Sequence, residues 1–131
     1  NKYAVISAFG SGESSNISWL VSPAINLNAT TGEILSFATE VGFYRAGTVL
    51  EVYISTDFAG DPSVATWTQL NPRIATNTDV ISGNFSPFIS SGPIDISSYS
   101  GDVFIAFKYI GSATANKTST FEIDNFKVTG L

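Results

Sequence analysis

Apolar and polar side chains alternate with a period of two along most of this chain. In residues 48–56, the apolar residues Leu50, Val52 and Ile54 fall on one face of an extended segment. Residues 102–110 alternate in the same way, but both of their faces are largely apolar, which predicts a strand that is covered on both sides. The same pattern predicts further strands at residues 3–9, 19–21, 25–27, 35–38, 67–70 and 121–128.

Turn residues separate these strands about every 8–12 residues, a spacing that is typical of β-sandwiches and jelly rolls. We therefore predict one all-β domain over residues 1–131, built as a two-sheet antiparallel β-sandwich of the jelly-roll type. No segment carries a sustained helical stripe, and residues 61–66, where Pro62 follows Asp61, are the best place for one turn of helix. Trp19 and Trp67 lie in strand-like segments, so we predict that both are in the core.

Charge and composition exclude several classes of function. The 131 residues carry a net charge of −5, and the six Lys and Arg residues are scattered, so we expect no nucleic-acid partner. No apolar run approaches the roughly 18 residues of a membrane-spanning helix, and we expect no membrane insertion. The chain has neither His nor Cys, so it lacks the usual ligands of zinc, and the absence of His removes the usual base of a catalytic serine; we expect no enzymatic activity.

An aromatic loop is the first candidate binding site. Phe43, Tyr44 and Arg45 lie between the strand that ends near residue 41 and the strand that begins at residue 48. Aromatic faces beside an arginine suit sugar rings, which are apolar on their C–H faces and form hydrogen bonds at their rims. The alternative is that one of the two rings covers the core. Phe85 and Phe88 flank a proline in the long, strand-poor segment 71–93, and we add them to the candidate site.

Two acids in the last predicted strand are the second candidate. Glu122 and Asp124 are two residues apart, so they project from the same face of the sheet. Close carboxylates repel each other unless a cation or solvent relieves the repulsion, and calcium accepts carboxylate and amide oxygens. Asn125, Glu13 and Asn16 could complete such a site. A solvated acidic edge is the alternative, and the pattern alone does not separate the two.

Several segments together resemble the choice-of-anchor J and cleaved-adhesin domains, which are MAM-like jelly rolls of secreted Bacteroidetes proteins. Residues 18–27, SWLVSPAINL, are similar to that family's W-L-(I/V)-S-P-x-I-(D/N)-L signature. Three later parts agree with family motifs in order and spacing: residues 50–58 with 65–68, residues 91–101, and residues 103–109 with 121–125. The resemblance covers nearly the whole chain. It departs at Phe121, where the family usually has Trp, and in lacking a further upstream segment.

The resemblance implies a jelly roll that is attached to proteases, glycan-degrading enzymes or adhesins and exported to the cell surface or the medium. It also implies a structural calcium ion with an acid of the final strand as ligand. That role carries over to Asp124 and less directly to Glu122, with Glu13 as the suggested early-chain ligand. Because the chain begins with Asn1 and not with Met, we expect a module excised from a larger protein.

These observations favour a non-catalytic carbohydrate-binding module, because an aromatic loop lies on a polar, weakly charged surface and the similar family occurs beside glycan-degrading enzymes. We expect it to be secreted or at the cell surface, and to act as a monomeric module that keeps an attached enzyme near a polysaccharide or oligosaccharide. The scarcity of cations favours a neutral glycan unless calcium bridges to an acidic one. The alternative is an adhesin or protein-interaction domain of a cell-surface protein, and a structural spacer is the third possibility.

Overall fold

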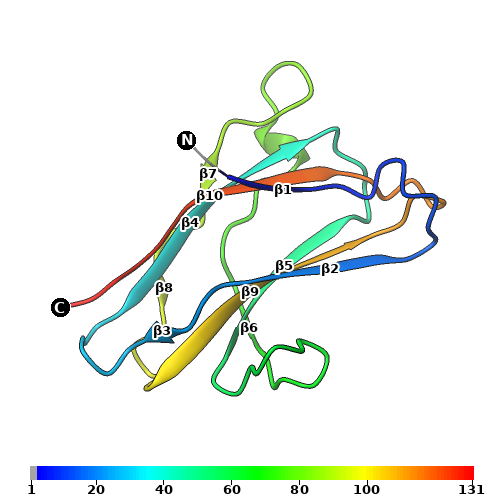
Figure 1. The fold of residues 1–131 in the computed structure, drawn as a ribbon. Coiled ribbons are helices and arrows are strands. Elements are labelled where there is room, and N and C mark those ends of the chain that lie inside the picture. Colours follow the sequence, from blue (N-terminus) through cyan, green and yellow to red (C-terminus); the bar gives the residue numbers. More distant parts are fainter. Residues whose placement is uncertain (1–2) are drawn as a thin grey trace.

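The computed structural model describes residues 3–131, which form two antiparallel sheets packed face to face (Figure 1). Sheet 1 has the order β1-β10-β4-β7, and β8 also pairs with β4. Its strands are β1 (Ala4–Ile6), β10 (Thr120–Thr129), β4 (Ile34–Gly42), β7 (Ile89–Ser90) and β8 (Ile94–Asp95). Sheet 2 has the order β2-β9-β5-β6, and β3 also pairs with β9. Its strands are β2 (Asn16–Val21), β9 (Asp102–Gly111), β5 (Val49–Ser55), β6 (Thr68–Leu70) and β3 (Ile25–Asn26).

This architecture confirms the predicted all-β sandwich. Strands that follow each other in the chain, such as β1 and β2 or β4 and β5, lie in opposite sheets, and the strand order is that of a jelly roll. Each predicted strand is present with shifted ends. The predicted helical turn at residues 61–66 is wrong, because Asp61 instead closes a turn by accepting a hydrogen bond from the Ser63 amide at 2.9 Å. A short 3-10 turn, η1 (Asn77–Asp79), occurs elsewhere.

The core lies between the sheets and follows directly from the period of two. In β9 the residues Val103, Ile105, Phe107 and Tyr109 all point inward and are buried. The ring of Phe107 meets the ring of Phe37 from sheet 1 edge to face, with centroids 4.9 Å apart. Each such side chain contributes about 2 kcal/mol of burial free energy, so the long central strands supply much of the stability.

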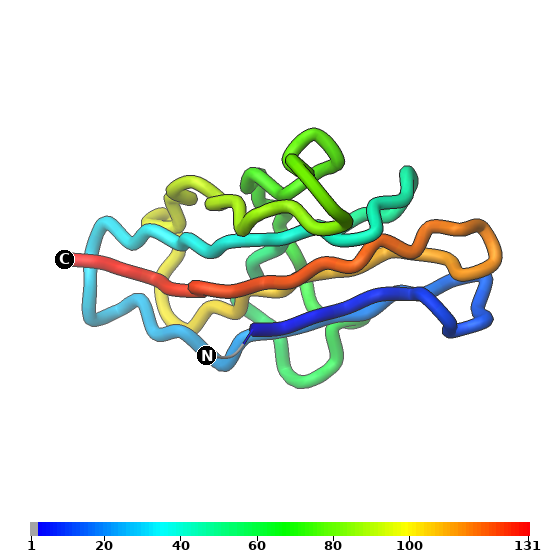
Figure 2. The backbone as a smooth tube through the Cα atoms, turned by 90° about the horizontal axis from the view of Figure 1, so that it is seen from above, coloured from blue at the N-terminus to red at the C-terminus, as the bar shows by residue number. Residues whose placement is uncertain are grey.

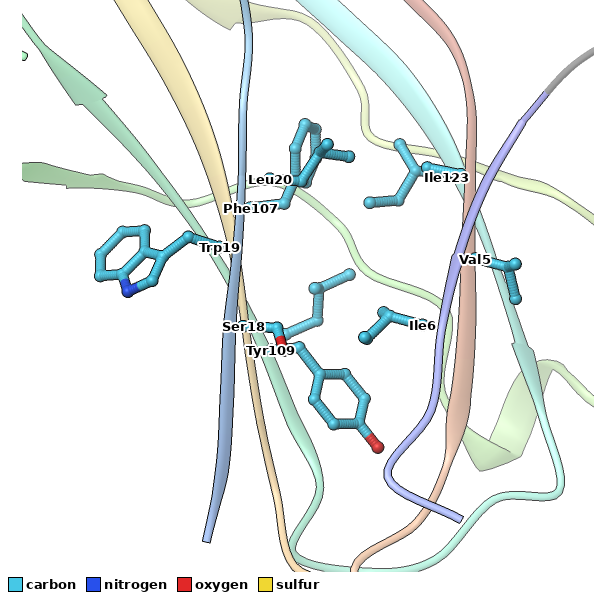
Figure 3. Close-up of a pocket in the computed structure, with 10 residues that line it drawn as sticks. Val5, Ile6, Ser18, Trp19, Leu20, Phe107, Tyr109 and Ile123 are labelled. Carbon is cyan, nitrogen blue, oxygen red and sulfur yellow. The ribbon is translucent and has the colours of Figure 1, made fainter. Parts of the chain in front are cut away.

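Trp19 and Trp67 do not belong to this core, and the prediction that they do is wrong. In β2, Leu20 faces the sandwich, so Trp19 points to the outer face of sheet 2 (Figure 3). There its ring stacks on Trp67 with centroids 5.4 Å apart and planes at 25°, and Lys108 Nζ lies 5.0 Å from the Trp19 ring. With Tyr53, Phe58 and Phe104, the two rings form a separate aromatic cluster on this outer face.

One edge of the sandwich is open. Between β1 and β2 lies a cavity of about 210 Å³ whose walls are mostly apolar side chains, among them Ile6, Leu20, Phe107 and Ile123 (Figure 3). The edge strands β1 and β2 belong to different sheets and do not pair with each other. The apolar side chains between them therefore line a cleft that is open to solvent. We call this feature the edge cleft.

The hydroxyl group of Tyr109 ends the core at one side of the molecule. Tyr109 is only 2% exposed. Its hydroxyl accepts a hydrogen bond from the Ala8 amide at 3.0 Å and donates one to the Ser119 carbonyl at 2.8 Å. A buried amide and a buried carbonyl from distant parts of the chain are thereby satisfied by one side chain. The contact also requires glycine at position 111, since a Cβ there would lie 2.7 Å from the Tyr109 ring.

Replacing Tyr109 by phenylalanine tests the importance of this hydroxyl. The Tyr109→Phe variant leaves the buried Ala8 amide and Ser119 carbonyl without a partner, and we expect it to lower the free energy of unfolding by about 1–3 kcal/mol. Tyr53→Phe is the matched control, because its hydroxyl bonds Glu51 on the outer face of sheet 2. Urea denaturation measures both, and equal losses in the two variants would contradict the prediction.

Candidate functional site

Three connections meet at one end of the sandwich, opposite the C-terminus (Figure 2). They are the start of the β1–β2 connection, the β4–β5 loop and the β9–β10 hairpin. Between them lies a groove of about 380 Å³, which we call the end groove. Its walls combine aromatic rings, hydroxyl groups, one amide and one guanidinium, from Ser7, Phe9, Phe43, Arg45, Asn116, Thr118 and Thr120.

Phe9 contributes an almost completely exposed ring on a fixed backbone. Its side chain is 83% exposed. The Ser7 hydroxyl accepts a hydrogen bond from the Phe9 amide at 3.1 Å and donates one to the Thr118 carbonyl, also at 3.1 Å. The neighbouring Ala8 is buried and bound to Tyr109. Keeping a large apolar ring in water forgoes about 2 kcal/mol of burial free energy, so an exposed ring on a fixed backbone is a candidate contact for a ligand.

Phe43 provides the second ring and is held in an unusual backbone conformation. Its φ angle is +48°, in the left-handed region that bulky residues rarely adopt, and its side chain is 52% exposed. Its amide donates to the Asn84 carbonyl at 2.9 Å. The Phe85 ring supports it edge-on, with centroids 5.3 Å apart. Phe85 itself rests on Gly42, where a Cβ would come within 2.2 Å of the ring.

Arg45 has a backbone that is held by hydrogen bonds and a side chain that is exposed to solvent. Its amide donates to the hydroxyl of the buried Ser119 at 2.7 Å, and its carbonyl accepts from that hydroxyl at 3.1 Å. The Thr48 hydroxyl donates to the same carbonyl at 3.1 Å. The exposed guanidinium makes one hydrogen bond in the described part of the chain, from Nη1 to the Tyr44 carbonyl at 3.3 Å.

The structure separates the five residues predicted to bind a ligand. Phe43 and Arg45 line the end groove, and the ring of Phe85 packs edge to face against the ring of Phe43 without lining the groove itself. Tyr44 packs against the core, so the alternative that one ring of this loop covers the core applies to it. Phe88 lies elsewhere, in a wide hollow of about 740 Å³ on the outer face of sheet 1.

Sequence reasoning missed the rest of the end groove. Phe9 was placed in a predicted strand, and the hairpin residues Asn116, Thr118 and Thr120 carried no signal of their own. A lone Phe directly before the turn residue Gly10 is the one feature that could have pointed to an exposed ring.

The acidic residues form a different arrangement from the predicted one. Glu122 and Asp124 do lie on one face of sheet 1, and Glu122 pairs across the strands with Glu40. Burial, a hydrogen bond with Glu122 and its negative charge all hold the pKa of Glu40 above its usual value. Glu13 lies at the end-groove side, where its carbonyl accepts the Ala113 amide at 2.9 Å.

The three predicted metal ligands are therefore not gathered at one place. Within residues 3–131, no group of three or more Asp, Glu, His or Cys side chains is placed to hold a metal ion. Glu13, Glu122 and Asp124 do not fit the six to eight oxygen ligands of calcium as a set. Calcium binding by this chain stays a prediction, which thermal unfolding with and without a chelator would check.

The Glu40–Glu122 pair predicts a pH effect on stability. Because its pKa is raised in the folded state, Glu40 contributes stability below its ordinary value of 4.5, and this contribution is lost as the pH rises through the raised pKa. We expect Glu40→Gln to gain about 0.5 kcal/mol of unfolding free energy relative to the unmodified protein between pH 4 and pH 7. Denaturant titrations at both pH values measure this difference. The exposed Glu13→Gln serves as control, and an equal gain there would refute the assignment.

Comparison with known proteins identifies a family for this chain. No curated protein matches the chain. A family model described as "Domain of unknown function (DUF5017)" matches residues 25–131, which include β3 to β10 and most residues of the end groove. This match does not bear on the resemblance to choice-of-anchor J domains, which stays a prediction. The chain belongs to the DUF5017 family.

Proposed function

We propose that this chain is a non-catalytic carbohydrate-binding module and that the end groove is its binding site. One observation supports this above all others: the exposed rings of Phe9 and Phe43 line the same groove, together with hydroxyl groups and a guanidinium. A pyranose ring offers apolar C–H faces for aromatic contact and hydroxyl groups around its rim for hydrogen bonding.

The site is preorganised. The backbones of Phe9 and Arg45 are held by Ser7 and Ser119, and Phe43 is held by Asn84 and Phe85. A ligand therefore meets residues whose backbones were ordered during folding, which lowers the entropy cost of binding and favours binding even by a few contacts. With two rings and a handful of hydrogen bonds, the affinity for a short oligosaccharide should be roughly micromolar to millimolar.

Catalysis is not part of the proposal. Glycoside hydrolysis commonly uses two carboxyl groups about 5 Å or more apart, one on each side of the sugar. None of the residues that line the end groove is acidic. Glu40 and Glu122 pair directly across β4 and β10 on sheet 1, and neither of them lines the end groove.

The cellular context is also a proposal. The polar, weakly charged composition and the resemblance to exported jelly rolls support a secreted or cell-surface module that keeps an attached enzyme near its polysaccharide. In the part of the chain that the structure describes, no helix is long and apolar enough to cross a membrane.

A protein-interaction or adhesin domain is the second candidate, and the edge cleft favours it. Leu20 is 48% exposed at the mouth of this cleft, and Val5 and Ile17 are exposed on the adjoining edge strands. Exposed apolar side chains next to unpaired strand edges are a common feature of protein-binding surfaces. Substitutions in the edge cleft would impair this function, whereas substitutions in the end groove would not.

Aromatic substitutions test the carbohydrate proposal. We expect Phe9→Ala and Phe43→Ala each to weaken binding about tenfold or more, because each removes one ring that contacts the sugar, a loss of about 1.4 kcal/mol. Isothermal titration against a panel of soluble plant, algal and bacterial polysaccharides measures the affinities. Phe88→Ala is the matched control, since its ring lies in the separate hollow on sheet 1 and its loss should leave binding unchanged. Absence of binding by the unmodified domain across the whole panel would overturn the proposal.

A further inference from the structure

The charge of the end groove differs from the charge of the chain as a whole. The chain has a net charge of −5, yet the groove is lined by one arginine and by no acidic residue. From this difference and from the free guanidinium of Arg45, we infer that the groove binds an acidic sugar unit, a uronic acid whose carboxylate pairs with Arg45. The inference rests on the proposed carbohydrate-binding function and specifies its ligand class.

A second cation lies at the same end of the sandwich as the groove but does not line it. Lys117 is exposed and is adjacent in sequence to Asn116, which lines the groove. Its aliphatic stem covers Gly47 of the β4–β5 loop, since a Cβ at Gly47 would be 2.9 Å from Lys117 Cε. Two of the six cationic residues of the chain are thus directed to the loops of one end. Glu13 approaches the same hairpin through its carbonyl, but it is not among the residues that line the groove.

The guanidinium of Arg45 is available for a ligand. Within residues 3–131 the only ion pair joins Arg73 and Asp79, so no carboxylate of the described chain neutralises Arg45. Of its side-chain N–H groups, one donates to the Tyr44 carbonyl and the others are free to bind a ligand. A planar guanidinium can donate two parallel hydrogen bonds to a carboxylate, which an ammonium group cannot do.

The position of Arg45 is fixed before any ligand arrives. Both its amide and its carbonyl bond to the Ser119 hydroxyl, and Ser119 is completely buried. The anchored backbone fixes the root of the side chain in the lining of the same groove as Phe43. A sugar ring that lies on Phe43 would therefore bring a carboxylate at its rim within reach of the guanidinium. Chain-wide composition favours a neutral glycan, but these local contacts favour an acidic one.

Matched ligands test the inference directly. The probes are an oligogalacturonate and the same oligomer as its methyl ester, which differ in charge and in one methyl group on each esterified unit, supplemented by an oligomannuronate and a mannan oligomer of equal length. We expect the acidic member of at least one pair to bind at least fivefold more tightly in 20 mM salt. Because added salt screens an exposed ion pair, this preference should fall below about twofold in 500 mM salt.

Variants locate the charge recognition. Arg45→Gln should abolish the preference for the acidic ligand, so that the acidic and the neutral member of a pair bind with affinities within twofold of each other. Arg45→Lys should restore only part of the preference, since it restores charge without the planar pair of donors. Lys127→Gln is the matched control: it removes one positive charge from an exposed position on sheet 1, outside the end groove, and should leave the preference unchanged.

The outcomes distinguish failure of the acidic-sugar inference from failure of the proposed carbohydrate-binding function. Equal binding of acidic and neutral ligands would overturn the inference and leave carbohydrate binding intact. Absence of binding to any glycan, acidic or neutral, would overturn both. A preference for the acidic ligand that persists in Arg45→Gln would remove Arg45 from its assigned role and overturn the inference. Melting temperatures within about 2 °C of the unmodified protein confirm folding, and they are expected because Ser119 bonds the backbone of Arg45 and not its side chain.

Discussion

One buried hydroxyl group connects the core of this sandwich to the surface that we propose binds a ligand. Tyr109 links the Ala8 amide to the Ser119 carbonyl, and Ser119 in turn holds both backbone polar groups of Arg45. A continuous series of hydrogen bonds therefore runs from the apolar interior to the residues that line the end groove. In a low-dielectric setting such bonds are costly to break, which is why loops from three distant parts of the chain can hold a defined shape.

The alternation of side chains predicts the sandwich well, because a period of two requires extended strands and an apolar row requires a facing sheet. It fails at Trp19 for a physical reason. Both faces of β2 carry apolar residues, and alternation cannot tell which of two apolar faces is inside; the pairing with β9 decides it. The failed helix at residues 61–66 has a local cause, since the Asp61 side chain closes a turn there.

The candidate site is only partly visible in sequence. Phe43 and Arg45 are found because they lie between two strongly patterned strands. Phe9 and the β9–β10 hairpin residues are missed because only the folded topology brings them to the same end. The direction of Phe43 depends on its left-handed backbone and on the support of Phe85, more than forty residues away in sequence. Likewise, the carboxylate partner of Glu122 is set by strand register, which selects Glu40.

The packing of Phe85 on Gly42 has a consequence for how this surface can change. Any side chain at position 42 would displace the ring that supports Phe43, so these three positions cannot be altered one at a time without disturbing the others. Ligand preference can instead diversify through residues whose backbones are anchored independently of their side chains, as at Arg45. The groove thus separates an aromatic frame of mutually dependent positions from a position whose side chain can change without loss of its backbone hydrogen bonds.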